Sequence, residues 1–95
     1  MARLIWTIQT AEDLENIFSY ISKDSIKYAR IQVIRIREQV NILKNHPQMG
    51  RIVPEVGNEN LREVIFGSYR IIYRYNSGNL IEIITIHHSA MLLKL

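Results

Sequence analysis

The chain of 95 residues contains no cysteine, only two prolines and only one tryptophan. Without cysteine, neither a disulfide framework nor a thiolate metal site can form. Long hydrophobic runs are also missing, since Ile71–Tyr73 and Ile81–Ile86 fall far below the ~18 apolar residues of a membrane span. Near the N-terminus, Thr7 and Gln9 are polar where a signal peptide would stay apolar. We therefore expect a cytoplasmic protein with no membrane segment.

The overall composition is that of one folded domain. Apolar residues make up 47% of the sequence, which is enough for a hydrophobic core, and the length suits a single domain over residues 1–95. The formal net charge is +3. A basic balance favours anionic partners, such as nucleic acid or an acidic protein, without distinguishing between them.

Two segments show helical periodicity. We interpret Thr10 as the N-cap of a first helix over Ala11–Ser22, in which apolar residues recur at helical spacing. Ser25 caps a second, longer helix, which should end near Asn45-His46 because Pro47 disfavours helical geometry before it. One face of this second helix is apolar: Ala29, Val33, Ile36, Val40 and Leu43. The short link between the helices predicts an antiparallel helical hairpin.

Strand patterns flank the hairpin. Arg3–Ile8 predicts an opening strand, and a long loop over Pro47–Asn60 leads into three more, at Leu61–Phe66, Tyr69–Tyr75 and Leu80–His87. Short links make these last three an antiparallel meander. The expected fold is α+β, in the order β-α-α-β-β-β, with the hairpin packed on a small, largely antiparallel sheet. The first strand could join either edge of the meander.

Basic residues recur in the meander and just before it, at four positions: Arg51, Arg62, Arg70 and Arg74. A cluster of the first three, with the fourth as a possible member, is geometrically plausible. Guanidinium groups hold phosphates and carboxylates, and they stabilise charge that builds on a phosphate during transfer. The alternative, which spacing alone favours, is an ordinary sheet face on which Glu63 or Glu82 pairs with the arginines.

The adjacent histidines His87 and His88 suggest a metal site, which we reject. Neighbouring residues on a strand face opposite sides, so they cannot readily bind one ion together. We predict neither a metal nor a cofactor. One of the two could act as an acid–base group, because imidazole titrates close to neutral pH.

The second helix carries more apolar residues than one face needs. Ile31, Ile34 and Ile42 lie well off its main apolar face. The interpretation that the pattern favours is a helix buried on two sides, by the first helix and by the sheet. The other is an exposed apolar surface that binds a partner.

Several short motifs follow one another in a recognisable order. They include Trp6-Thr7, Ala11-Glu12-Asp13-Leu14, Gly50-Arg51, Leu61-Arg62-Glu63, Gly67-Ser68-Tyr69-Arg70 and Ile86-His87-His88-Ser89-Ala90. Each motif is short, but the ordered set covers nearly the whole chain. It resembles the toxins of the RelE/ParE superfamily, from bacterial toxin–antitoxin pairs. The fold of that family is similar to the one expected above.

The resemblance implies a type II toxin that is neutralised by tight binding of a co-expressed antitoxin, often in a module that stabilises a plasmid. A toxin–antitoxin hetero-oligomer follows, with Ile31, Ile34 and Ile42 as the expected antitoxin-binding residues. A basic toxin also suits an antitoxin with an acidic binding segment. ParE-like members poison DNA gyrase and need no known catalytic residues. RelE-like members cleave mRNA in the ribosome, through attack of a ribose hydroxyl on the neighbouring phosphate.

For RelE-like activity, the resemblance assigns catalytic roles to four residues: Arg51, Arg62, Arg70 and His87. One departure argues against that activity, because many relatives carry an arginine where this chain has Met91, and methionine cannot hold a phosphate. A tail rich in lysine and tyrosine is also missing. The sequence therefore favours a ParE-like toxin acting on DNA gyrase. The alternatives are a RelE-like, ribosome-dependent mRNA endoribonuclease, a toxin with reduced or lost activity, and a non-toxic nucleic-acid-binding module.

Overall fold

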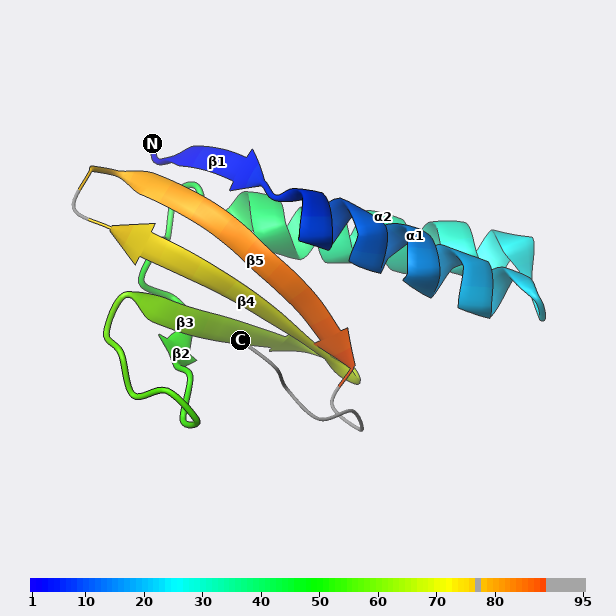
Figure 1. The fold of residues 1–95 in the computed structure, drawn as a ribbon. Coiled ribbons are helices and arrows are strands. Elements are labelled where there is room, and N and C mark those ends of the chain that lie inside the picture. Colours follow the sequence, from blue (N-terminus) through cyan, green and yellow to red (C-terminus); the bar gives the residue numbers. More distant parts are fainter. Residues whose placement is uncertain (77, 89–95) are drawn as a thin grey trace.

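A computed structural model describes residues 1–76 and 78–88 of the chain; Met91 and the remainder of residues 89–95 lie outside the described residues. Its elements follow the chain as β1 (Arg3–Trp6), α1 (Ile8–Ser22), α2 (Ile26–Ile42), β2 (Arg51–Ile52), β3 (Leu61–Phe66), β4 (Tyr69–Asn76) and β5 (Leu80–His88). Two helices pack on a mostly antiparallel sheet, so the α+β expectation is confirmed (Figure 1). Within the described part, no helix is long and apolar enough to cross a membrane.

The sheet has five strands in the order β1-β5-β4-β3-β2. The meander of β3, β4 and β5 is antiparallel as expected, while β1 runs parallel to β5 and so joins that edge. The expected loop over residues 47–60 contains one further short strand, β2, which pairs with β3 through Arg51 and Ile52. The sequence did not predict this strand, because two residues are too few to show the alternation of a strand.

Helix α1 begins earlier than the sequence suggested. Its N-cap is Thr7, whose side-chain oxygen accepts a hydrogen bond from the backbone N–H of Thr10. Thr10 is itself buried, and its hydroxyl donates to the carbonyl of Ile83 at 2.7 Å. The prediction of Thr10 as the cap was therefore wrong: Thr7 is the cap, and Thr10 lies inside the helix.

The start of α1 also closes the open edge of β5. Strand β1 pairs with β5 only as far as Trp6 opposite Ile83. Beyond that point, the carboxylate of Asp13 accepts hydrogen bonds from the backbone N–H of Ile86 at 3.0 Å and the hydroxyl of Thr85 at 2.5 Å. Because an unpaired strand edge invites association with other chains, these contacts protect the sheet.

Helix α2 has the predicted cap at Ser25 and ends at Ile42, a few residues before the expected stop. Its apolar face and that of α1 pack on one face of the sheet to form the main core. The fully buried members of this core include Ile36, Val40, Leu43, Ile71, Tyr73, Ile81 and Ile83. We call this the helix face of the sheet and the opposite one the outer face.

A register shift between β4 and β5 at Ile72 and Tyr73 leaves both of these neighbours buried. Tyr73 enters the main core, whereas Ile72 packs with Val53 and Leu61 in a smaller cluster. The loop before β3 thus supplies Val53 to cover part of the outer face. A second, small core on this face holds the loop in place.

Tyr73 fixes the beginning of that loop. Its buried hydroxyl donates to the carbonyl of Pro47 at 2.7 Å and accepts from the backbone N–H of Gly50 at 2.9 Å. A Cβ atom at Gly50 would lie 2.6 Å from the carbonyl oxygen of Glu63 and 2.7 Å from the Tyr73 hydroxyl. Only glycine fits this close approach of loop and sheet, which also places Arg51 in β2.

Replacing Tyr73 with phenylalanine should lower the free energy of unfolding by about 1–3 kcal/mol, because a buried backbone N–H loses its acceptor. Urea denaturation measures the change. Tyr75→Phe on the same strand is the matched control, since within the described residues its hydroxyl makes no hydrogen bond. Equal stability of Tyr73→Phe and the native chain would contradict the proposed anchor.

Candidate functional site

Two of the predicted arginines meet a buried carboxylate on the outer face. Glu63 of β3 has a fully buried side chain. One of its oxygens lies 2.6 Å from Nε of Arg51 in β2, and the other lies 2.6 Å from Nε of Arg70 in β4. Glu63 therefore joins three neighbouring strands through its two oxygen atoms.

A second carboxylate completes this group. The two terminal nitrogens of Arg70 contact the two oxygens of Glu55 at 2.6 and 2.8 Å, in a bidentate pair. The hydrogen bonds from Arg70 lower the pKa of Glu55 from 4.5 to about 2, and both partners raise the pKa of Arg70. The group of Arg51, Arg70, Glu55 and Glu63, here called the ion-pair network, thus carries two positive and two negative charges.

Arg62 does not belong to this network. It lies opposite Tyr73 in the register of β3 and β4, so it points to the helix face while its neighbour Glu63 points outward. Its guanidinium donates to the carbonyl of Gly50 at 3.0 Å. The expected cluster of Arg51, Arg62 and Arg70 is therefore divided between two faces by strand alternation. Arg–Glu pairing through Glu63, the alternative that spacing favoured, is the arrangement found.

The two histidines diverge as expected. His87 lies opposite Arg70, and His88 lies opposite Tyr69, against whose ring it packs edge-on at 5.4 Å. Both ring nitrogens of His87 are buried and have no hydrogen-bond partner. No group of three or more His, Asp or Glu side chains that could hold a metal ion occurs among residues 1–76 and 78–88.

Helix α2 presents apolar side chains to solvent. Ile34 is 54% exposed and Ile42 is also exposed, while Ile31 is half-buried. Burial on two sides, the interpretation that the pattern favoured, is therefore wrong for Ile34 and Ile42. The sheet and α1 cover only the face of α2 that carries Ile36 and Val40. An exposed apolar surface, the other interpretation, is present.

A groove between the two helices was not expected from the sequence. It has a volume of about 690 Å³, and its apolar lining includes Trp6 of β1, Leu14 and Phe18 of α1, and Val33 of α2. Arg37 of α2 also lines it. Phe18 was a signal for this groove, since it is apolar and lies one helical turn after the buried Leu14 but is itself only half-buried.

The two helices carry opposite charge. Helix α1 contains three acidic residues and no lysine or arginine: Glu12, Asp13 and Glu15. Helix α2 contains four basic residues against the single acid Glu38: Lys27, Arg30, Arg35 and Arg37. All four basic side chains are exposed. The exposed isoleucines of α2 thus lie within a positively charged surface, which suits an apolar and acidic partner segment.

Known proteins resemble this chain over most of its length. A family model described as the ParE toxin of the type II toxin–antitoxin system parDE matches residues 4–93. The chain is 29% identical to Toxin RelE2 of Caulobacter vibrioides, over 97% of this chain and 100% of that protein. It is 31% identical to the putative toxin Y4kP of Sinorhizobium fredii, over 92% of this chain and 88% of that protein.

Solved structures give the same picture. The chromosomal ParDE toxin–antitoxin system from P. aeruginosa matches with a TM-score of 0.76 and 26% identity, over 93% of this chain and 96% of the other. The toxin–antitoxin complex RelBE2 from Mycobacterium tuberculosis matches with a TM-score of 0.67 over 92% and 96%, and at 17% identity it shows the shared fold alone. On the evidence of residues 4–93, the chain belongs to the ParE toxin family of type II toxin–antitoxin systems, within the RelE/ParE superfamily.

Proposed function

We propose that this toxin acts by binding DNA gyrase rather than by cutting RNA, and that its antitoxin covers the exposed surface of α2. The observation that carries the choice of target is the ion-pair network on the outer face. A ribonuclease of this superfamily needs basic side chains that are available to a phosphate. Here, Arg70 and Arg51 already hold carboxylates.

Displacing these carboxylates is unfavourable. A phosphate that took both arginines from Glu63 would leave a fully buried carboxylate without a partner, which costs about 3–5 kcal/mol for a typical buried pair. Arg62 cannot assist from the same side, because it lies on the helix face. The ion-pair network thus offers little net positive charge for RNA. This electrostatic balance supports a toxin that works through surface contacts with a protein target.

One observation favours the second candidate, a RelE-like ribonuclease. The imidazole of His87 has no hydrogen-bond partner and lies opposite Arg70, so an acid–base group stands beside a guanidinium. The similarity of the chain to a relative named Toxin RelE2 also supports this alternative. In that mechanism, Arg51, Arg62, Arg70 and His87 would keep the catalytic roles that the sequence predicts. For this mechanism, the substrate would have to displace at least one carboxylate from the arginine that holds it.

The antitoxin surface follows from exposure and charge together. Ile34 and Ile42 are exposed on α2 within a surface that carries four basic side chains. An amphipathic acidic segment could bury both isoleucines and pair with the arginines at its edges. Ile31 is half-buried and would extend the same contact. Coverage of this surface in a hetero-oligomer would suit a plasmid-stabilising module, in which the antitoxin neutralises the toxin by tight binding.

The target is tested with purified toxin. We expect the native chain to inhibit DNA supercoiling by gyrase and to leave mRNA intact on translating ribosomes. The variant Arg51→Ala should inhibit gyrase within about twofold of the native chain, since Arg51 is 63% exposed and Arg70 still neutralises Glu63. RNA cleavage by the native chain that Arg51→Ala or Arg70→Ala removes would establish the ribonuclease instead.

The antitoxin surface is tested with a matched pair of variants. Ile34→Asp should weaken antitoxin binding by roughly 10- to 100-fold, because a charge replaces a buried apolar contact at the interface. Ile65→Asp is the control, since Ile65 is exposed to the same degree, 53% against 54%, but lies on β3. The toxin variants and the antitoxin are co-purified, separated and refolded, and calorimetric titration then gives the antitoxin affinity of each variant. Equal affinities for the two variants would remove α2 from the interface.

A further inference from the structure

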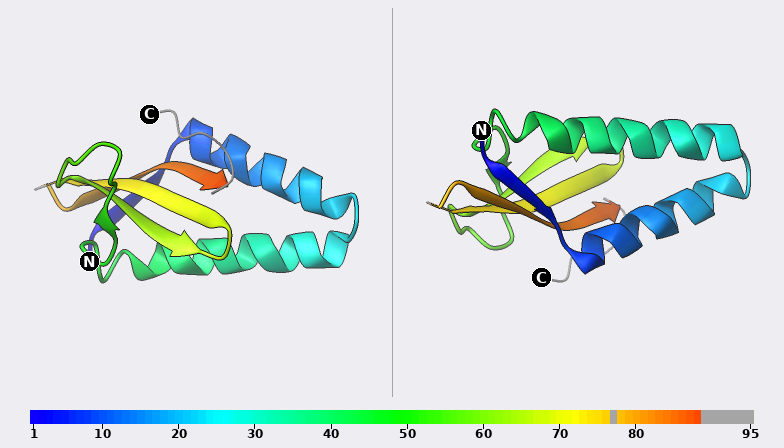
Figure 2. Two further views of the ribbon diagram at one scale, coloured as in Figure 1. Left: turned by 90° about the horizontal axis from the view of Figure 1, so that it is seen from below. Right: turned by 90° about the horizontal axis from the view of Figure 1, so that it is seen from above.

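The end of the helical hairpin extends past the sheet. In both views of Figure 2, the turn that joins α1 to α2 lies well beyond the strands. Ala29, near the start of α2, is fully buried, but the sheet does not reach the hairpin end. Side chains near this turn that point toward the sheet side therefore find no strand to pack on.

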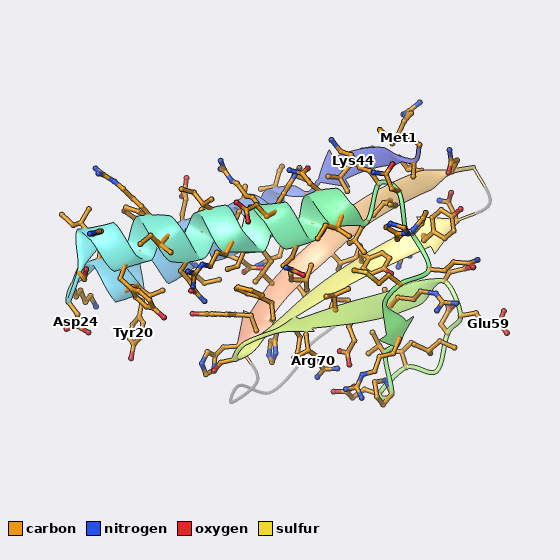
Figure 3. All side chains as sticks on the ribbon, turned by 180° about the vertical axis from the view of Figure 1, so that it is seen from behind. Met1, Tyr20, Asp24, Lys44, Glu59 and Arg70 are labelled. Carbon is orange, nitrogen blue, oxygen red and sulfur yellow. The ribbon has the colours of Figure 1, made fainter. Side chains whose placement is uncertain are left out.

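Two tyrosines occupy this overhang. Tyr20 near the end of α1 is 73% exposed, and Tyr28 in the first turn of α2 is 52% exposed. Figure 3 shows Tyr20 projecting from the hairpin toward the sheet side. Tyr69, the first residue of β4, packs instead against the main core and the ring of His88. Two exposed phenol groups, those of Tyr20 and Tyr28, thus lie near the hairpin end.

These side chains contribute little to the fold. Tyr20 and Tyr28 make no side-chain hydrogen bond in the described part of the chain, and most of each ring is open to water. An exposed tyrosine contributes little to the stability of a monomer, but tyrosines are enriched where proteins bind other proteins. A rigid aromatic ring gives a large contact area at a low cost in conformational entropy.

The charge around the tyrosines is mainly positive. The ammonium group of Lys23 lies 5.9 Å from the centre of the Tyr20 ring, in a cation–π contact. Lys27 and Arg30 are also exposed nearby, against the single acid Asp24. A partner with acidic side chains would therefore be complementary to the hairpin end.

We propose that Tyr20 and Tyr28 at the hairpin end form the surface that binds an acidic region of the target protein, beside the α2 surface that the antitoxin covers, with which it shares Lys27 and Arg30. The proposal rests on the proposed function, since it names the contact surface for that target. A protein is favoured over nucleic acid because Lys23 lies over one face of the Tyr20 ring, which leaves only the other face open to a stacked base.

The double variant Tyr20→Ala/Tyr28→Ala tests this surface. We expect the concentration needed for half-maximal gyrase inhibition to rise at least tenfold, while antitoxin affinity stays within twofold and the circular dichroism spectrum is unchanged. The control Ile65→Ala/Met49→Ala removes two exposed apolar side chains elsewhere and should leave inhibition unaltered. The single variant Lys23→Glu should inhibit gyrase less than the native chain, because it places a like charge against the acidic partner. This difference should grow as the salt concentration is lowered.

Four results would overturn the proposal, the last of them only if the native toxin leaves gyrase unaffected. Unchanged inhibition by the double variant would show that the tyrosines do not bind the target, and an equal loss of antitoxin affinity would show one shared surface. Tight binding of a single-stranded oligonucleotide by the native chain, lost in the double variant, would show a nucleic-acid site. If the native toxin leaves gyrase unaffected, the proposed target is wrong, and growth arrest on expression tests the surface instead. Growth arrest by the double variant would then overturn the proposed surface. Normal growth with the double variant, when the native chain arrests growth, would support it.

Discussion

The buried carboxylate of Glu63 is the constraint on which the rest of the outer face depends. A fully buried charge is stable only with charged partners and complete hydrogen bonding. Arg51 and Arg70 supply both, from the strands on either side of β3. The loop before β3 brings Glu55 to the terminal nitrogens of Arg70. Tyr73 fixes the start of that loop, because its hydroxyl accepts a hydrogen bond from the backbone N–H of Gly50. Sheet, loop and charge balance are therefore one arrangement.

This arrangement divides the molecule by function. On the outer face, the ion-pair network carries balanced charges, and its two arginines link the loop and strands β2 and β4 to Glu63. The hairpin carries the features that the core does not need: exposed isoleucines on α2, a groove between the helices, and tyrosines at its overhanging end. A protein with these features is suited to bind other proteins through two regions of one hairpin.

Sequence patterns predicted the local elements well. Alternation and the Gly67-Ser68 turn located β3 and β4 to within a residue, and Ser25 was the cap of α2. Features that depend on distant partners were missed. Thr7 and Thr10 are both good caps, and in the structure both hydroxyls donate to the carbonyl of Ile83, a contact with a distant strand that no local pattern predicts. Strand alternation also separates Arg62 from the other arginines, and the overhang depends on how the helices and strands differ in length.

Acute inhibition in cells tests the central claim most directly. After induced expression of the native chain in bacteria, DNA synthesis and protein synthesis are followed separately by pulse labelling. A toxin that binds gyrase stops DNA synthesis first, while protein synthesis continues for longer. If protein synthesis stops first instead, the ribosome is the target, and Arg51 and Arg70 must release their carboxylates to act on RNA.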